Sequence, residues 1–400
     1  MIYTFLKSYM RNAEALLLMF WAIPFFSVAQ DGFFITHGPY IQALDESSVS
    51  ILWTTNKPGI SWVELAPDDS THFYREERRR FFAVSDGIKV IDTLHHVRLE
   101  GLQPGTGYRY RVYSHEVKSH RWGTIEYGRI AATQVYRAKP LFFKTSDPVA
   151  ETVSFAVIND IHGNNELMER LLDQVDFAEN DLIFFNGDMA SFFLDETQLF
   201  ADFMDTSVKR FAAEHPMYYV RGNHETRGPF AGKYASYFPT VSGKPYYLLR
   251  RGPVCFVVLD SGEDKPDSDI EYSNVAAFDD YRTVQAAWLK EIVQLAEYRE
   301  APYKVIICHM PPFGGWHGEQ EVATKFVPVL NEANAQVMLS GHLHRHLKRL
   351  PGNEGHVFPV LVNSNQAIIR AKADSLRLQI EVCGPNGEHI DSMTIYPDGR

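Results

Sequence analysis

Five short polar motifs contain the side chains of this chain that are best suited to binding metal ions. They lie between residues 160 and 344, combine carboxylate, amide and imidazole groups, and each follows an apolar run of strand length. Such groups are ordinary ligands of divalent metals in proteins. Their number and grouping predict a site for two metal ions. The motifs are Asp160-Ile161-His162-Gly163, Gly187-Asp188, Gly222-Asn223-His224-Glu225, His309, and Gly341-His342-Leu343-His344.

The spacing within two motifs predicts that neighbouring groups converge. Residues i and i+2 of an extended segment point the same way, so Asp160 and His162 are expected to grip one ion. For the same reason His342 and His344 are expected to share a face and to serve adjacent ions. The set holds histidine and carboxylate but no thiolate, which favours zinc, manganese or iron over a structural cysteine site.

Strands and helices that alternate along the chain must position these motifs. Strands buried on both faces, with amphipathic helices between them, predict a layered α/β domain over residues 151–400. Every motif falls at the carboxyl end of a strand, where ligands collect in such sheets. The expected strands are 153–158, 182–185, 217–220, 254–259, 305–308, 337–339, 358–362, 376–382 and 393–396, the last two forming a hairpin, and the expected helices are 166–178, 196–214, 283–298 and 320–334.

Residues 31–147 have a different pattern, with period-two alternation at 49–54 and 108–113 and no convincing helix. This predicts a small all-β sandwich. The turn at 101–108 resembles the tyrosine corner of fibronectin type III domains, in which the hydroxyl of a residue such as Tyr108 bonds back to the turn backbone. The alternative is a generic β-sandwich, and neither interpretation indicates a function for this module.

The N-terminus has the pattern of a secretory signal peptide spanning residues 1–29. Lys7 and Arg11 precede an apolar run at 15–26, and small residues at 27–29 suit cleavage before Gln30. The alternative is a membrane anchor, but the run is about 12 residues against the roughly 20 that a bilayer span needs. We therefore expect an exported protein, periplasmic, at the cell surface or secreted, with no stable membrane span after cleavage.

Charge and cysteine content narrow the range of partners. The formal charge of the whole chain is −11, and removal of two cations and one anion with residues 1–29 makes it −11 − 1 = −12. An acidic body argues against nucleic acid or an anionic membrane as a partner. The charged run at 76–80 is expected to be a solvated strand edge or loop. Cys255, Cys308 and Cys383 lie in apolar runs and are expected to be buried and unpaired.

The order of the five motifs resembles that of the calcineurin-like metallophosphoesterase superfamily over roughly residues 151–365. Gly38-Pro39-Tyr40 and Trp53 also look like the start of the small β-domain that precedes the catalytic domain of purple acid phosphatases. The resemblance implies a β-sandwich flanked by helices behind a fibronectin type III-like domain. It also implies that Asp188 bridges the two ions. One ion would be held by Asp160, His162, Asp188 and His344, and the other by Asp188, Asn223, His309 and His342.

The same resemblance implies a mechanism, in which a metal-bound hydroxide attacks a phosphate ester. His224 would be an unliganded imidazole that faces substrate and protonates the leaving group. Glu225 would either orient His224 or lie behind the ligands, and both options stay open. Asn164, Arg221 and His317 lie beside motifs or in the glycine-rich loop after His309, and are expected to contact substrate.

Two positions depart from the purple acid phosphatase pattern. Ser191 stands where those enzymes have the tyrosine that binds ferric iron, and His162 stands where their first motif has glycine. A purple ferric site is therefore not expected. In Ser/Thr phosphatases the position of Ser191 holds an aspartate that pairs with the catalytic histidine, so the group that orients His224 is not identified by the resemblance.

The predicted activity is hydrolysis of a small-molecule phosphomonoester or phosphodiester, because the metal core is shared and the surrounding loops set specificity. One alternative is a phosphodiesterase for a cyclic nucleotide or a lipid headgroup. Another, from a different class, is a binding or adhesion protein that works through its β-domain. The sequence does not indicate an oligomeric state.

Overall fold

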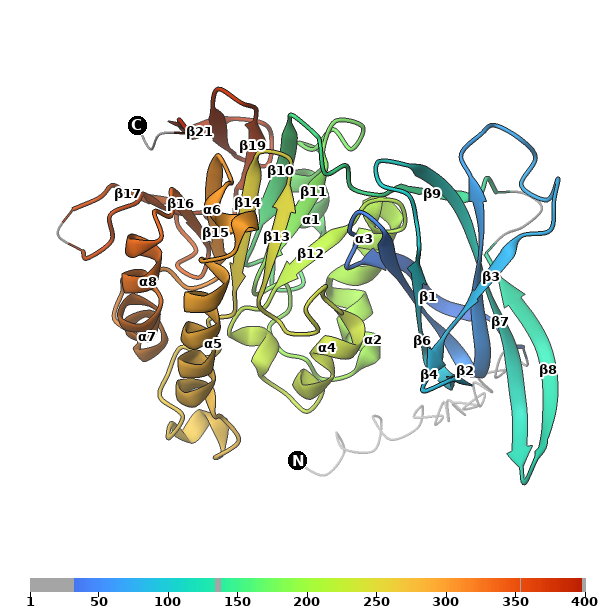
Figure 1. Cartoon of the computed structure of the whole chain (residues 1–400). Helices are drawn as coiled ribbons and strands as arrows, with labels where there is room; N and C mark the ends of the chain where they lie inside the picture. The colour runs from blue at the N-terminus through green and yellow to red at the C-terminus, as the bar shows by residue number, and fades with distance from the viewer. Residues whose placement is uncertain (1–31, 134–137, 353, 398–400) are drawn as a thin grey trace, which may run out of the picture. The chain divides into compact units, whose positions relative to one another are not determined.

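The computed structural model describes residues 32–133, 138–352 and 354–397 (Figure 1). The predicted signal peptide, residues 1–29, lies outside the described residues. Residues Phe33–Arg400 form one compact unit. Within it, an all-β region is followed by an α/β region built on two six-stranded sheets.

The all-β region is organised around one long strand, β2 (Ser48–Pro67), which takes part in two layers. Its first half pairs with β1 and β6, and its second half pairs with β3 and β7. A register shift between Thr54 and Gly59 marks the change of layer. The side chains between the layers are apolar and include the fully buried Trp53. The other strands are β1 (Ile35–Gln42), β3 (Arg79–Phe82), β4 (Val84–Ser85), β5 (Ile88–Lys89), β6 (Ile91–Glu100), β7 (Gly107–Arg121), β8 (Thr124–Ala132) and β9 (Leu141–Lys144).

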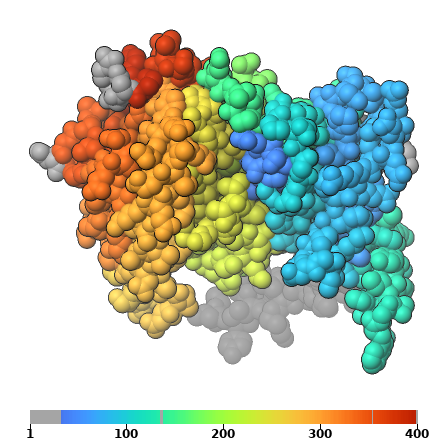
Figure 2. All heavy atoms as spheres, in the orientation of Figure 1, coloured from blue at the N-terminus to red at the C-terminus, as the bar shows by residue number. Residues whose placement is uncertain are grey.

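Three expectations for this region are met. No helix occurs among the described residues from 32 to 144. The hydroxyl oxygen of Tyr108 accepts a hydrogen bond from the backbone N–H of Gln103 at 2.9 Å, which is the predicted tyrosine corner. The charged run at 76–80 is largely exposed next to β3. The hairpin of β7 and β8 projects from the rest of this region, with a fully exposed Trp122 at its tip (Figures 1 and 2).

The α/β region is a sandwich of two sheets with apolar side chains from both filling the space between them. Each sheet contains a group of neighbouring parallel strands that are almost completely buried, which accounts for their largely apolar sequences. The first sheet has the order β12 (Met217–Val220), β11 (Leu182–Asn186), β10 (Val153–Ile158), β19 (Ile368–Ala373), β20 (Leu378–Cys383) and β21 (His389–Ile395). The second has the order β13 (Tyr247–Arg251), β14 (Val254–Leu259), β15 (Tyr303–Cys308), β16 (Val337–Ser340), β18 (Val360–Val362) and β17 (Leu347–Arg349).

Helices cover the outer face of each sheet (Figure 1). One continuous helical segment, from Glu196 to Ala212, alternates between α and π geometry. The three cysteines are free and buried, as expected. The α-helices are α1 (Asn165–Leu172), α2 (Glu196–Leu199), α3 (Asp205–Ser207), α4 (Tyr234–Tyr237), α5 (Phe278–Ile292), α6 (Ala296–Arg299), α7 (His317–Lys325) and α8 (Val327–Glu332).

The helix expected at 196–214 ends two residues early, at Ala212, and the other three predicted helices differ by more. The helix expected at 166–178 ends at Leu172, and a separate turn follows in which Asp176 accepts a hydrogen bond from the backbone N–H of Ala178. The helix expected at 283–298 begins five residues earlier and is interrupted before α6. The one expected at 320–334 is divided into α7 and α8, with Pro328 in the first turn of α8.

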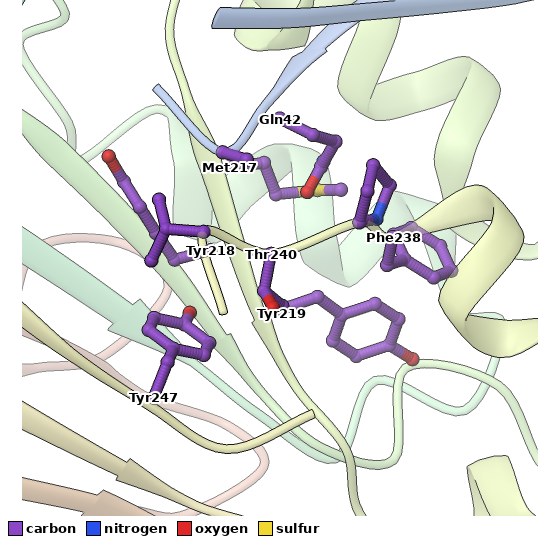
Figure 3. A pocket seen from close by; sticks show the side chains of 10 residues that line it. Gln42, Met217, Tyr218, Tyr219, Phe238, Thr240 and Tyr247 are labelled. Atoms are coloured by element: carbon purple, nitrogen blue, oxygen red, sulfur yellow. The ribbon is translucent and has the colours of Figure 1, made fainter. Parts of the chain in front are cut away.

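A small pocket lies where the end of β1 meets β12 and the segment 238–241 (Figure 3). Gln42 points into it, and its side-chain nitrogen is buried without a hydrogen-bond partner. The free volume is about 10 Å³, which is roughly the space that one water molecule needs. This gap is too small for a substrate.

Candidate metal centre

The five motifs meet at the carboxyl ends of strands from both sheets. Asp160 follows β10, Asp188 follows β11 and Asn223 follows β12 in the first sheet, whereas His309 follows β15 and His342 follows β16 in the second. The parallel strands of each sheet bring their ends to one edge of the sandwich. The predicted placement of the motifs is therefore confirmed.

The backbone at the motifs differs from the extended loops that the spacing argument assumed. Five of the proposed ligands adopt left-handed conformations, which non-glycine residues rarely do. The argument from extended alternation was wrong, although the side chains do converge. Left-handed residues outside glycine cost energy and concentrate at functional sites. Their φ angles are 55° for Asp160, 49° for His162, 55° for Asp188, 70° for His342 and 52° for His344.

Glycine is required at two places because aspartate carboxylates lie directly against the backbone. A Cβ atom on Gly341 would lie 2.6 Å from Oδ2 of Asp160, and one on Gly222 would overlap the carboxylate of Asp188. Side chains at these positions would push the carboxylates out of the site. The glycines of the motifs therefore serve close approach as well as tight turns.

Asp160, His162 and His344 form the first cluster of potential ligands. One ligand atom from each lies within 4.8 Å of the others. Nε2 of His344 is 3.1 Å from Oδ1 of Asp160 and 3.3 Å from Nε2 of His162. Oδ1 of Asp160 is buried and accepts no hydrogen bond. A buried carboxylate oxygen left without a donor is a group that a cation satisfies.

Asp188, His309 and His342 form a second cluster with the same spacing, and Asn223 lies among them. The Asn223 side-chain oxygen is 3.1 Å from Nδ1 of His342. It is also 3.3 Å from Oδ2 of Asp188 and from Nε2 of His309. In the opposite orientation the amide nitrogen would donate to these atoms and the oxygen would accept from Arg227. A bound cation favours the first orientation, because four lone-pair donors then face one point.

Asp188 joins the two clusters, since it also groups with His162 and His224. It is buried, and Nε2 of His309 lies 3.0 Å from its Oδ2. Burial raises the pKa of Asp188, but the charge and hydrogen bond of His309 outweigh this and hold it below its usual value. Burial lowers the pKa of His309, yet the carboxylates of Asp188 and Asp160 raise it to about 10. Asp188 and His309 thus form a buried ion pair, and each supplies the opposite charge that the other needs when it is removed from water.

His224 is held with one ring nitrogen free to face the site. Its Nδ1 is 2.9 Å from the backbone oxygen of Ser191, which makes Nδ1 the donor and leaves Nε2 directed inward. Nε2 lies 4.0 Å from Oδ2 of Asp188. The side chains of His224 and His344 are 26% and 47% exposed, so the centre opens to solvent on their side.

Ser191 contacts two of the imidazoles. Its carbonyl orients His224, and its hydroxyl oxygen lies 3.2 Å from Nδ1 of His162, leaving Nε2 of His162 directed at the first cluster. The sequence marked Ser191 only as a departure from the purple acid phosphatase pattern. A backbone carbonyl has no sequence signature, so its role in orienting His224 required the structure.

Glu225 braces the loops that carry the ligands. Its carboxylate accepts hydrogen bonds from the backbone N–H of Asp188 at 2.9 Å, of Gly222 at 2.8 Å and of Met189 at 2.8 Å. The hydroxyl of Tyr219 donates to it at 2.6 Å. Burial and the nearby Asp188 raise the pKa of Glu225. Among the described contacts none joins its side chain to His224, so the option that it lies behind the ligands is the one the structure favours.

The three expected substrate contacts have other partners in the structure. The Asn164 side chain accepts from the backbone N–H of Leu167 and caps α1. Nη2 of Arg221 lies 2.6 Å from Asp260. Nε2 of His317 is 2.7 Å from Oδ1 of Asp279. Among the described contacts, none places these three side chains against the metal-ligand set.

Sequence reasoning missed one further acidic group beside the centre. Glu319, in the first turn of α7, has a fully buried carboxylate whose Oε1 lies 3.7 Å from Nε2 of His342. Its position in the helix, three residues after Trp316, is the only local signal, and it indicates a helix cap.

In the part of the chain that the structure describes, no helix has the length and apolar character of a membrane span.

Comparisons with known proteins agree with both regions. Residues 153–346 match the model of the calcineurin-like phosphoesterase family, and residues 39–126 match that of the purple acid phosphatase N-terminal domain. A structure of a purple acid phosphatase from yellow lupin (Lupinus luteus) seeds is similar in fold. Its TM-score is 0.63 at 12% identity, over 90% of this chain and 74% of that one.

Two curated relatives are purple acid phosphatases 21 and 18 of Arabidopsis thaliana, at 23% and 22% identity. The matches cover 64% and 65% of this chain. They cover 54% and 59% of the relatives, so the chain spans little more than half the length of the proteins it matches. Residues 153–346 are thus similar to calcineurin-like phosphoesterases, and residues 39–126 are similar to the N-terminal domain of purple acid phosphatases.

Proposed function

We propose that this chain is an exported phosphoesterase that depends on two metal ions and hydrolyses small phosphate esters. The observation that carries the proposal is the position of Asp188 between two clusters of lone-pair donors. Asp160, His162 and His344 lie on one side of it, and His309 and His342 on the other. A carboxylate has two oxygens to give, which suits a ligand shared by two ions.

The side chains at this site are chemically suited to binding metal ions. Buried lone pairs face one another at the Asn223 side-chain oxygen, and Oδ1 of Asp160 accepts no hydrogen bond. We assign Asp160, His162, Asp188 and His344 to one ion, and Asp188, Asn223, His309 and His342 to the other. Iron, manganese and zinc all suit these ligands. Two such ions would supply Lewis acidity and lower the pKa of a bound water to about 7.

The protein's own groups bind the ester and move the proton. With two divalent cations bound, the two anionic ligands Asp160 and Asp188 would leave the site positive by about two charges, which would attract a phosphate despite the acidic body. His224, with Nδ1 held by the Ser191 carbonyl, directs Nε2 toward the site. Protonated there, it donates to the leaving oxygen, a contribution of typically about 10²–10⁴-fold.

The residues near the centre also bear on the metal type. Ser191 offers a hydroxyl to His162 where purple enzymes have a tyrosine, so no phenolate is available at that position. We expect a colourless protein. A strong visible charge-transfer band in the metal-loaded protein would contradict this assignment.

Metal analysis together with a substrate panel tests the proposal. The purified protein should contain about two metal ions per chain and should cleave aryl phosphate monoesters, diesters or both, with chelation abolishing the activity and metal restoring it. Ratios of kcat/KM across monoesters, cyclic nucleotides and lipid headgroup diesters would identify the substrate class. A protein with no stoichiometric metal and no cleavage of any ester would favour the alternative of a binding or adhesion protein acting through its β-domain.

Export is the remaining part of the proposal. The pattern at residues 1–29 supports it, and the purple acid phosphatase relatives are compatible with it. N-terminal sequencing of the mature protein should begin at Gln30. An intact N-terminus on a protein that stays with the membrane fraction would instead indicate an anchor.

A further inference from the structure

We infer that Glu319 is a positioning residue, which orients the ligand His342 and couples the loop at 313–319 to one of the two metal sites. This inference rests on the proposed function, because it takes His342 as a ligand. It concerns a residue that none of the five motifs contains.

The two oxygens of the Glu319 carboxylate face different groups. Its Oε2 accepts a hydrogen bond from the backbone N–H of Trp316 at 2.9 Å. Its Oε1 is buried, accepts no hydrogen bond and lies 3.7 Å from Nε2 of His342. A buried carboxylate oxygen without a donor is costly, so it needs a partner. The proton on His342 Nε2 is that partner, a few tenths of an ångström beyond hydrogen-bond range.

The geometry of His342 agrees with this assignment. Its Nδ1 lies 3.1 Å from the Asn223 side-chain oxygen, inside the second cluster. A ring nitrogen that binds a metal must keep its lone pair free, so the imidazole proton has to sit on Nε2. That nitrogen faces Glu319. The carboxylate therefore selects the tautomer in which Nδ1 can act as a ligand.

The group behind His342 is a carboxylate, whereas His309 and His162 have neutral groups behind them. The Nδ1 atom of His309 lies 2.7 Å from the backbone oxygen of Asn186, and that of His162 faces the Ser191 hydroxyl. Both of those acceptors are neutral. A carboxylate behind a metal-bound histidine makes the imidazole a stronger ligand than a neutral acceptor does. Glu319 should therefore strengthen one metal site selectively.

The same carboxylate secures a surface loop. Glu319 is at the third position of α7 and holds the loop through Trp316, whose side chain is half exposed. Gly314 packs against the carboxylate, and a Cβ atom there would overlap it. Movement of this loop would displace Glu319 from His342. Occupancy of the metal site and the conformation of the loop are thus linked.

Glu321 provides a matched comparison on the same helix. Its carboxylate is paired with Lys325 and lies 3.7 Å from Nε of Arg282. Within the described residues, no lysine or arginine pairs with Glu319, and the ionisable side chain that faces its Oε1 is His342. The carboxylate of Asp264 is near enough to raise the pKa of Glu319 but offers it no proton. Replacing either residue with glutamine removes the same charge from the same helix, but only one change affects His342.

Zinc titration of Glu319→Gln and Glu321→Gln, by calorimetry and chelator competition, tests the inference. For Glu319→Gln we expect about 10–100-fold weaker binding of one of the two ions, the range typical of lost outer ligand contacts. The other ion should bind as in the wild type, and Glu321→Gln should bind both ions normally. Unfolding of the metal-free variants at similar temperatures would show that both fold.

Fluorescence gives a second readout that a purely structural role would not change. Zinc binding should alter the emission of Trp316, identified by subtraction with a Trp316→Phe variant, and Glu319→Gln should abolish that response. Wild-type affinity for both ions in Glu319→Gln overturns the inference and leaves the proposed function intact. Failure of the wild-type protein to bind two ions would instead overturn the proposed function.

Discussion

His95 and His309, one buried histidine from each region of this protein, have opposite electrostatic environments. In the all-β region, Nε2 of His95 lies 2.7 Å from the Thr55 hydroxyl, and burial lowers the pKa of His95 to about 4. In the α/β region His309 is equally buried, yet the carboxylates of Asp188 and Asp160 overcome burial and raise its pKa to about 10. Burial alone keeps His95 neutral, whereas the two carboxylates beside the buried His309 belong to the proposed metal site.

The all-β and α/β regions also differ in where their left-handed non-glycine residues lie. The left-handed non-glycine residues of the all-β region, such as Ser70, Asp86 and Trp122, lie outside the strands, in turns. Those of the α/β region include five proposed metal ligands within two clusters. Packing of both sheets has to hold these five in place. The comparison predicts that changes at the clusters affect chemistry, whereas changes in the all-β region affect stability alone.

The largest effect is expected from Asp188→Ala. Both proposed ions lose a ligand, so activity should fall by about 10⁴-fold or more, the scale seen when a group on which a whole site depends is removed. Bound metal, measured by elemental analysis, should drop below two ions per chain. Asp205→Ala, an exposed carboxylate next to His37, should leave both values unchanged. Activity that survives Asp188→Ala would rule out the shared-ligand arrangement.

His224→Asn should lower kcat by about 10²–10⁴-fold while metal content stays near two per chain, because the role proposed for His224 is to move a proton and not to hold an ion. Steady-state kinetics and elemental analysis on one preparation would show this. His317→Asn should turn over nearly normally, since its Nε2 is engaged by Asp279. Loss of metal from the His224 variant would mean that this residue is a ligand.

Glu225→Gln should weaken the support of the ligand loops without removing a ligand. The amide nitrogen would face backbone N–H groups that now donate to a carboxylate, at a cost of roughly 2–4 kcal/mol in the free energy of unfolding. Urea unfolding of the metal-free protein measures it. Glu271→Gln, at a half-exposed carboxylate, should cost far less. Equal stability of the two variants would argue against the bracing role.

His95 should make the protein less stable in mild acid. Its pKa is about 4 in the folded protein and near 6.5 unfolded, so the unfolded chain binds the extra proton between these values. The contribution is complete above pH 6.5 and is lost as pH falls toward 4, up to about 3 kcal/mol. Unfolding measured from pH 7.5 to 4 should show a shallower decline in His95→Gln. An identical decline would place the pH dependence elsewhere.

The smallest effect is expected from Tyr108→Phe. The backbone N–H of Gln103 loses its acceptor, which should lower the free energy of unfolding by about 1 kcal/mol. Thermal unfolding would measure it, and kcat/KM should stay at the wild-type value. A marked loss of activity would show that the all-β region contributes to the chemistry.

Most strands of the α/β region were predictable, since a buried parallel strand such as β10 or β12 reads as an uninterrupted apolar run with the expected bounds. Helix ends were less predictable. The helix α1 ends at Leu172, and the residues after it form turns such as the one closed by Asp176, which hydrophobic periodicity does not register. The full length of β2 was also not predicted, since the sequence indicated a strand only at 49–54. Its change of layer at 54–59 depends on partners far along the chain.

The sequence by itself determined the chemistry available to this protein. Types and spacing of its polar residues identified two carboxylates, an amide and a set of imidazoles at strand ends. Their order indicated the similarity to calcineurin-like phosphoesterases that the family model also finds at residues 153–346. These are properties of side chains and local patterns. Tertiary structure alone decided how the imidazoles are oriented. A carbonyl of Ser191, a carbonyl of Asn186 and the carboxylate of Glu319 each face one ring nitrogen from a distant part of the chain. Such contacts depend on the path of the backbone in the folded protein, so they cannot be predicted from residue types.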